Sequence, residues 1–495
     1  MPQPTPRLLI PLLLLLLLLP HPPTQGSTYP LPLLPDSLTT NYISARDLYR
    51  NRLLYLSGEG SDLNPAINHV VRLAEGWIAD PTTYTVMNKM THSTTDNNTT
   101  ARIAPSGDPH DYFSLAKYYW PDPATPFGLP YIPRPGQINP SSTSLPNDRA
   151  SLDAVIESVW TGALAWFWTR DERFSGMAGE RLRVWFVEEG TRMNAAVGLE
   201  WDNWVVGRSS VGGGNGTVGG RNGTVGVGGN NLTDLATGMD LTFTSLHLLL
   251  DAILLLSPTS SITPLLPALT TWFTTYHSWL LTSPRAVAEQ SQPSIRGLNT
   301  DIQHLALLLF LNRTAEADTY VRNTTIPRVT GAIGPDGRVA SALTSGGADT
   351  WQNSVSYLSS LFTLGLLTLN NPPLPSLFSV TTTDNRSIRG ALDFLLPYAL
   401  ANGTGWPTGP NETFSVGAQF WGMVGVAWVV WGEGRYRDAV VRGQGGGRWE
   451  TARLWMPYGA FELRAESSGV VGRGEGVYGR WVLMIFGIGC GVWWM

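Results

Sequence analysis

Long apolar runs at helical spacing, separated by clusters of Pro, Gly, Asn and Ser, dominate this chain of 495 residues. Segment 151–171 is typical, and Asn147 and Asp148 before it can cap a helix. Its apolar positions recur mostly three or four residues apart: Leu152, Val155, Ile156, Val159, Leu164 and Phe167. Similar runs predict helices over 180–189, 240–256, 262–281, 301–311, 352–369, 388–400 and 414–431. Alternating, strand-like segments are scarce, so we predict an all-α fold.

Several of these predicted helices are apolar nearly all round, as in 246–256, and neighbours must cover them on most sides. Short loops favour antiparallel helical hairpins, and a closed ring of hairpins is one way to bury such helices. Two stretches interrupt the pattern. Residues 112–149 are rich in Pro and aromatic side chains and predict a long ordered surface loop, whereas the Gly-rich stretch 207–230 predicts a glycosylated insertion outside the core.

The N-terminal residues 1–26 have the layout of a secretory signal peptide: a positive start, an apolar run from Leu8 to Leu19 and a polar exit. Ten Asn-x-Ser/Thr sequons follow along the chain. Together these features predict a secreted glycoprotein.

The C-terminal residues 466–495 combine small residues, a Gly-rich spacer and an apolar tail from Trp481. This is the layout of a glycolipid-anchor signal, which would attach the protein to a membrane or wall at the cell surface. The alternative is a final helix packed on the core. The sequence therefore predicts one main domain over 27–465.

Composition excludes several classes of protein. With 43% hydrophobic and 14% charged residues, the chain fits neither a disordered protein nor a coiled coil. The net charge of −5 and the scattered cations predict no nucleic-acid partner. The single cysteine, Cys490, excludes an intramolecular disulfide and a thiolate zinc site. No metal or cofactor motif stands in a supporting context, so we expect neither.

The segment 106–112, Ser-Gly-Asp-Pro-His-Asp-Tyr, is followed by an aromatic stretch that contains Tyr119, Trp120 and Asp122. Aromatic faces stack on sugar rings, while Asp, His and Asn side chains bind sugar hydroxyls. The stretch therefore predicts a saccharide shelf that includes His110. An equally good alternative is that the aromatic residues and prolines have a purely structural role and attach a long loop to the domain.

These segments resemble, in the same order along the chain, the alginate lyase domain family, that is polysaccharide lyase family 5 and its fungal relatives. The motifs that carry the resemblance are 106–112, 118–123, 128–132, 147–149, 185–186, 191–194, 240–256 and 279–284. The resemblance spans about Tyr55 to Asp438. It implies an incomplete α/α toroid with a tunnel-like cleft and β-elimination on uronate polymers.

β-Elimination needs one group that neutralises the uronate carboxylate, a base that removes the C5 proton and an acid for the leaving oxygen. The family's Asn-Asn-His-Gly-Thr-Trp-Tyr-Asp segment corresponds here to residues 294–301. Gly297 and Asp301 are retained, but Arg296 stands where the family has its histidine. Because arginine does not lose its proton near neutral pH, it cannot be the base; it could instead bind the carboxylate.

Counting back from Leu361 places Asn353 where the family has its catalytic tyrosine. Tyr357 lies one helical turn further on, and His304 lies one turn after Thr300. Either they rebuild an acid and base pair, or both are ordinary core residues. The candidate catalytic residues are thus His110, Arg296, His304 and Tyr357. The candidate substrate-binding residues are Tyr119, Trp120, Asp122, Arg149, Asp301 and Asn353.

Three functions remain open. The first is a secreted polysaccharide lyase-like protein with an acidic polysaccharide as its substrate. The second is a catalytically inactive carbohydrate-binding or wall protein of the same fold. The third is a glycoside hydrolase that uses paired carboxylates such as Asp202 and Asp301. His247 and His277 lie in apolar helices and are expected to be core residues. The sequence does not predict an oligomeric state.

Overall fold

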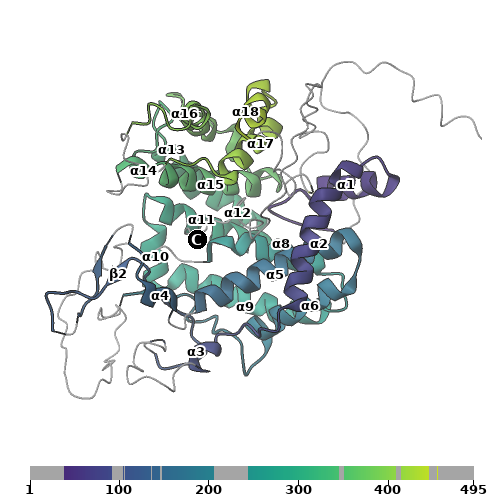
Figure 1. Ribbon diagram of the computed structural model, residues 1–495, viewed down its shortest axis with the longest axis vertical. Coiled ribbons are helices and arrows are strands. Elements are labelled where there is room, and N and C mark those ends of the chain that lie inside the picture. Colours follow the sequence, from purple (N-terminus) through teal and green to yellow (C-terminus); the bar gives the residue numbers. More distant parts are fainter. Residues whose placement is uncertain are drawn as a thin grey trace, which may run out of the picture. The chain divides into compact units, whose positions relative to one another are not determined.

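The fold, taken from a computed structural model, is built mainly of helices (Figure 1). The structure describes residues 38–91, 104, 106–126, 128–134, 137–144, 148–205, 243–344, 350–407, 414–444 and 454. Its α-helices are α1 (Ala45–Ser57), α2 (Asn64–Ala79), α3 (Asn88–Thr91), α4 (Pro140–Ser144), α5 (Asp148–Thr169), α6 (Glu172–Leu182), α8 (Leu246–Leu256), α9 (Leu266–Thr282), α10 (Pro284–Gln290), α11 (Ile295–Phe310), α12 (Thr314–Tyr320), α13 (Ile326–Ala332), α14 (Ala340–Thr344), α15 (Thr350–Leu369), α16 (Ile388–Leu400), α17 (Ala418–Trp431) and α18 (Gly434–Gln444).

Short π-helical and 3-10 turns extend several of these helices. The π turns are Arg183–Val187 after α6 and Val321–Thr325 after α12. The 3-10 turns are Ser61–Leu63, Phe243–Ser245, Thr263–Leu265 and Leu377–Ser379.

The described strands are few and short: β1 (Phe113–Leu115), β2 (Tyr119–Trp120), β3 (Ile132–Pro133) and β4 (Trp201–Trp204). β1 pairs in parallel with β4, and β2 pairs with β3 as an antiparallel hairpin. The β1–β4 pair joins the His110 segment to the chain beyond residue 194. The described residues of 112–149 thus include three short strands, and the mainly helical fold expected from the sequence is confirmed.

The predicted helices agree with the structure where the apolar period is strong. The prediction for 388–400 matches α16 at both ends, and the others fall on α5, α6, α8, α9, α11, α15 and α17. The predicted start of α11 at Asp301 is wrong, because the helix begins at Ile295 after the Ser294 N-cap. The signal peptide, the Gly-rich insertion and the C-terminal tail lie outside the described residues.

Several long helices pack on one another in a series. α5 contacts α2, α6 and α8; α11 contacts α8 and α15; and α15 contacts α17. Figure 1 shows α15 between α11 and the group formed by α16, α17 and α18. These residues all belong to one unit of the chain, Leu34–Met495.

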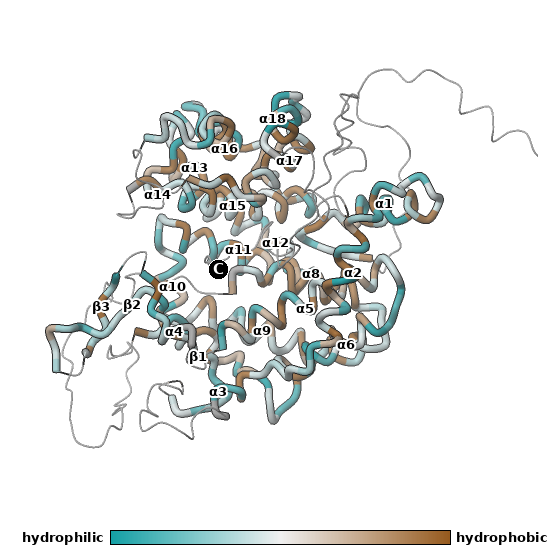
Figure 2. The backbone as a smooth tube through the Cα atoms, viewed as in Figure 1, coloured by the Kyte–Doolittle hydropathy of each residue, from teal (hydrophilic) through white to brown (hydrophobic). Residues whose placement is uncertain are grey.

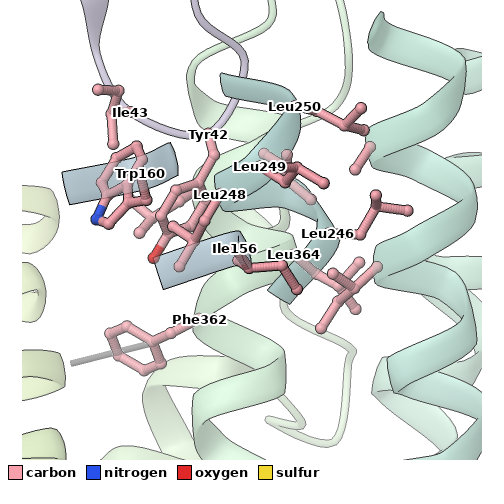
Figure 3. Close-up of a cluster of buried hydrophobic side chains, with 14 of the residues drawn as sticks. Tyr42, Ile43, Ile156, Trp160, Leu246, Leu248, Leu249, Leu250, Phe362 and Leu364 are labelled. Carbon is pink, nitrogen blue, oxygen red and sulfur yellow. The ribbon is translucent and has the colours of Figure 1, made fainter. Parts of the chain in front are cut away.

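Side chains from most of the described helices form one core, to which α5, α8 and α15 all contribute. Figure 3 shows Ile156 and Trp160 of α5 beside leucines of α8, with Phe362 and Leu364 of α15 close by. Helices α8 and α17 are correspondingly mostly apolar in Figure 2, whereas α18 is largely polar. This explains why the sequence shows helices that are apolar on nearly every side.

A buried carboxylate fastens the first described segment to this core. Asp251 of α8 accepts hydrogen bonds from the backbone N–H groups of Asn41 at 2.7 Å and of Tyr42 and Ile43 at 2.9 Å each. Because these donors point into the interior, a carboxylate that binds three of them offsets its own burial. Among the described helices, none is both long and apolar enough to cross a membrane.

Candidate functional site

The junction of α10 and α11 carries the residues that correspond to the family's Asn-Asn-His segment. Ser294 caps α11 by accepting a hydrogen bond from the Arg296 N–H, which leaves Arg296 on the first helical turn. Asp301 lies further along the same helix and is fully buried. The start of α11 therefore gathers the candidate residues Arg296, Asp301 and His304 on one element.

The guanidinium of Arg296 is held by a carboxylate of the preceding helix. Its Nε donates to Glu289 Oε2 at 2.6 Å, and its second nitrogen pairs with Glu289 Oε1. The side chains are only 12% and 3% exposed, respectively. Such a two-point pair satisfies the charge of the arginine inside the protein. In this arrangement the Arg296 fork is occupied by Glu289.

Asp301 is likewise paired within the interior. Its Oδ2 accepts from Arg328 Nε at 2.8 Å, and its Oδ1 accepts from the Tyr320 hydroxyl at 2.5 Å. Arg328 also donates to the backbone carbonyls of Gln290 and Gln292, at 2.6 Å each. Burial raises the pKa of Asp301, while Arg328 and the Tyr320 hydroxyl lower it. Asp301 thus links α11, α12 and α13 instead of facing a substrate.

Tyr357 and Asn353 lie on α15, which packs against α11. The Tyr357 side chain is buried, and its hydroxyl has no hydrogen-bond partner within the described part of the chain. Burial raises its pKa far above the usual range; the charge of Arg328 opposes that shift and the charge of Asp301 adds to it. Asn353 is half-buried. The structure therefore places Tyr357 close to the Asp301 group but inside the protein.

His304 belongs to a buried histidine pair. Arg313 donates to His277 Nδ1 at 3.0 Å, and His277 Nε2 lies 3.1 Å from His304 Nδ1. Because a guanidinium only donates, His277 must carry its proton on Nε2 and donate it to His304. Burial and then the charge of Arg313 lower the pKa of His277 to about 4, and burial, His277 and Arg313 together lower that of His304 to about 3; Glu316 opposes both shifts. The accepting nitrogen of His304 is therefore already occupied, which fits a core residue and not a base.

His110 lies in a different group, formed by the two most specific sequence motifs. Its Nδ1 is 2.7 Å from the carbonyl oxygen of Arg192, and its backbone N–H donates to Asp108 Oδ1 at 2.8 Å. Asn194 Nδ2 donates to Asp108 at 3.0 Å and to Asp111 at 2.8 Å. The side chains of His110, Asp108 and Asn194 are partly exposed. The segments 106–112 and 191–194 therefore form one connected polar surface.

A buried ion pair lies next to this polar surface in the chain and contacts the strand that follows it. Lys89 Nζ lies 2.9 Å from Asp148 Oδ2, and the same oxygen accepts the Phe113 N–H at 2.8 Å. Burial raises the pKa of Asp148 to about 6 and lowers the pKa of Lys89, and each charge opposes the shift of the other. The pair connects α3, the start of α5 and β1, and so fixes the chain that follows the segment 106–112.

The β2–β3 hairpin presents aromatic rings beside cations. The Arg134 guanidinium lies 5.3 Å from the centre of a Trp120 ring, and the Lys117 ammonium lies 4.9 Å from the centre of the Tyr118 ring. The Trp120 indole also donates to the Gln137 carbonyl at 2.9 Å. Tyr118 is 37% exposed, and Trp120 is partly exposed. This hairpin lies where the sequence predicts a saccharide shelf, and it places two cations beside the aromatic rings.

Three other candidates have structural partners. Tyr119 is buried in a small cluster with Ala116 and Val205. Asp122 caps a turn by accepting the Ala124 N–H at 2.9 Å. Arg149 pairs with Asp153 one helical turn away, at 2.7 Å. These residues shape the loop and the start of α5, and of the aromatic motif only its neighbours Tyr118 and Trp120 present rings to solvent.

The carboxylates considered for hydrolysis, Asp202 and Asp301, and the nearby Glu200 all have hydrogen-bond partners. Asp202 is fully buried and accepts from the Ser114 hydroxyl at 2.6 Å. Glu200 accepts from the Ser283 hydroxyl at 2.7 Å. With Asp301 paired to Arg328, these groups serve the fold. As expected, His247 and His277 are buried.

The structure thus separates the candidates into a buried group on α11 and α15 and an exposed group on the loops. Sequence reasoning missed the partners Glu289, Tyr320 and Arg328, for which no motif gives a signal. It also did not select Arg192 and Asn194, which bond to the His110 segment, although the segment that contains them is distinctive. In the described part of the chain, no group of three or more His, Cys, Asp or Glu side chains could hold a metal ion.

One cavity of about 520 Å³ lies between the end of α16, α17 and α18. Its lining contains none of the candidate residues: Ala399, Leu400, Asn402, Phe414, Ser415, Val416, Trp421, Arg442 and Gly443.

Comparison with known proteins agrees with the resemblance read from the motifs. The family model described as Alginate lyase matches residues 93–406. The fold is similar to the crystal structure of an alginate lyase from Bacteroides ovatus, with a TM-score of 0.69 and 24% sequence identity. That match covers 84% of this chain and 99% of the Bacteroides chain. No curated protein matches the chain.

Proposed function

Because the chain belongs to the alginate lyase family, we propose that it is a secreted polysaccharide lyase-like protein that cleaves an acidic, uronate-containing polysaccharide by β-elimination. The β2–β3 hairpin carries this proposal. Its Trp120–Arg134 and Tyr118–Lys117 pairs combine a surface for stacking sugar rings with positive charge. A neutral glycan would need only the rings, whereas a uronate polymer uses both.

The proposed architecture is an incomplete α/α toroid. The order of helix packing supports it, since α2, α5, α8, α11, α15 and α17 each contact the next one in that series. The intervening helices α6, α9, α16 and α18 contact members of the series and would form the outer layer. A toroid of this kind would hold a long polymer in a central cleft.

Secretion and glycosylation are part of the proposal. The four sequon asparagines within the described ranges, Asn312, Asn323, Asn385 and Asn402, are all exposed. Three of them, Asn312, Asn385 and Asn402, have positive φ angles. Attachment of glycans there would meet no packed neighbour. A mass shift of the exported protein on treatment with an N-glycosidase tests this point.

A second candidate function is binding without cleavage. The Arg296–Glu289 pair favours it, because the family's base position then holds a cation that is already paired inside the protein. Under this alternative the hairpin still binds the acidic glycan, and no group removes the C5 proton.

The discriminating experiment is incubation of the mature protein with mannuronan, glucuronan and pectate while the ultraviolet absorbance of the unsaturated product is followed. Lyase action produces this absorbance on at least one polymer. Retention on a uronate affinity gel without the absorbance would favour binding alone. New reducing ends without the absorbance would favour hydrolysis. A protein with neither activity nor retention contradicts the proposal.

A further inference from the structure

We infer that His110 and Arg192, on the two motif loops, form the uronate-binding and proton-transfer centre of this protein in place of the α11 residues. This inference rests on the proposed lyase function and specifies where its chemistry takes place. Two observations carry it. The first is an imidazole fixed through Nδ1 whose Nε2 has no hydrogen-bond partner among the described residues. The second is the exposed Arg192, whose backbone carbonyl contacts this imidazole and whose side chain pairs with no described acidic residue.

The loop 191–194 is held at every residue. Thr191 accepts from the Thr85 hydroxyl at 2.7 Å through its carbonyl oxygen, and its own hydroxyl donates to the Val184 carbonyl at 2.8 Å. The Arg192 N–H donates to the Glu188 carbonyl at 2.8 Å. The other two residues are fixed by Met193 N to Trp185 O at 2.9 Å and by Asn194 N to His110 O at 2.9 Å. The loop therefore presents its side chains from a rigid backbone, as catalytic groups require.

The Arg192 carbonyl determines which nitrogen of His110 can act as a base. A carbonyl oxygen only accepts, so the Nδ1 that lies 2.7 Å away must carry a proton. In the neutral ring, Nε2 is then the basic nitrogen. Of the residues that the structure describes, none bonds this nitrogen. Backbone contacts orient the imidazole much as a carboxylate does in other enzymes.

Arg192 supplies the charge that a uronate needs. Its side chain is exposed, and no described acidic residue pairs with its guanidinium. In this respect it is the opposite of Arg296, whose side chain is only 12% exposed and is bonded to Glu289. A guanidinium binds a carboxylate through two parallel hydrogen bonds. This contact would stabilise the negative charge that develops on the C6 carboxylate when the C5 proton is removed.

The two nearby carboxylates, Asp108 and Asp111, accept hydrogen bonds from residues of the two motif loops. Asp108 accepts from the His110 N–H and from Asn194, and Asp111 accepts from Asn194 and from the Ser106 hydroxyl at 2.6 Å. These bonds hold the two motif loops together. They also leave an exposed charge on Arg192, the residue whose backbone carbonyl contacts the imidazole.

The reaction at this centre is redox-neutral. His110 Nε2 takes the C5 proton while Arg192 stabilises the charge that spreads onto the C6 carboxylate. The electron pair then forms the C4–C5 double bond, the C4–O4 bond breaks, and O4 takes the proton back from the His110 imidazolium. Because one imidazole reaches one face of the ring, H5 and O4 must lie on the same face, as in mannuronan and not in pectate.

The test compares His110→Asn and Arg192→Ala with the wild-type protein on mannuronan. The asparagine amide can still donate to the Arg192 carbonyl, but it lacks the basic nitrogen. We expect kcat/KM to fall about 10²- to 10⁴-fold for His110→Asn. For Arg192→Ala we expect a loss of about 10- to 100-fold, the size of a charge-assisted contact. The matched control is Arg72→Ala, which removes an exposed arginine of α2 and should keep the wild-type rate.

Wild-type kinetics in His110→Asn would overturn the centre while leaving the lyase function in place. If the wild-type protein itself forms no unsaturated product, the proposed lyase function is wrong. Binding measurements then test whether His110 and Arg192 still form the uronate-binding centre. Addition of a mannuronate oligomer should shift the NMR signal of His110, assigned by its absence in His110→Asn, and Arg192→Ala should bind more weakly than Arg72→Ala. An unmoved signal and equal affinities would overturn the centre as well.

Discussion

At the residue scale, the position of the family's histidine shows how an ionic pair can replace a catalytic group. Arg296 cannot take a proton, and its charge is balanced by Glu289, which is 3% exposed. Removing one member of a buried pair is costly because it leaves an uncompensated charge in the interior. The pair should therefore behave as a structural element that the fold depends on.

We predict that Glu289→Ala lowers the free energy of unfolding by about 3–5 kcal/mol, and that adding Arg296→Ala restores a large part of it. Urea denaturation of the two single variants and the double variant measures this coupling. The control is Glu180→Ala, whose exposed pair with Arg183 should contribute less than about 1 kcal/mol. Equal losses for Glu180→Ala and Glu289→Ala would contradict the structural role.

The sequence could predict which residues stand at the family's catalytic positions, but not what they touch. Glu289 and Arg328 follow no motif, and their partners are chosen by how α10, α11 and α13 pack. His304 shows the same limit, because its protonation depends on Arg313 through His277. In contrast, the sequence did single out the segment around His110, because the residues of that motif are close together in the chain and contact one another.

At the element scale, the junction of α10 and α11 leaves no space at Gly297. A Cβ atom there would overlap the Gln292 carbonyl and the guanidinium of Arg328. We predict that Gly297→Ala lowers the free energy of unfolding by about 1–3 kcal/mol, because Arg328 must leave Asp301 to make room. The measurement is the urea midpoint.

Gly331→Ala is the matched control for this prediction. Gly331 is exposed within α13, and a Cβ atom there meets nothing within 4 Å. Because alanine favours a helix over glycine, this variant should gain about 0.5–1 kcal/mol. A gain at both positions would mean that Arg328 is not confined by Gly297.

The same junction shows why some element boundaries could be predicted and others not. α16 begins at a strong apolar period after Ser387, whose side chain accepts the Gly390 N–H at 3.0 Å. The first turn of α11 mixes polar and apolar residues, so the apolar period marks only its second half. The short helices α10, α12 and α13 are too brief for a period to emerge.

At the scale of the whole molecule, the His277–His304 pair couples global stability to pH. Both rings lie between α9 and α11, with Arg313 and Glu316 on one side and the Tyr320 ring 4.1 Å from the His304 ring. Every accepting nitrogen of the pair is occupied by a donor, so a proton can enter only when the pair opens. Unfolding exposes both rings and returns them to the usual histidine pKa of about 6.5.

The sign of the effect follows from these pKa values. In the folded protein the pKa is about 4 for His277 and about 3 for His304, below the unfolded value. Between these limits the unfolded chain binds more protons than the folded protein. The contribution of the pair to the free energy of unfolding is therefore fully present above about pH 6.5 and is lost as the pH is lowered. We predict that lowering the pH from 6.5 to 4.5, followed by urea denaturation, costs the wild-type protein more of its free energy of unfolding than it costs His277→Asn/His304→Asn. Buried Asp148 and Asp251, whose pKa values are raised to about 6 and about 7, act in the opposite sense, but equally in both proteins, so the comparison isolates the histidine pair. His110→Asn, the same change at a partly exposed histidine, should keep the wild-type pH dependence; the same pH dependence in the double variant would contradict the role of the pair.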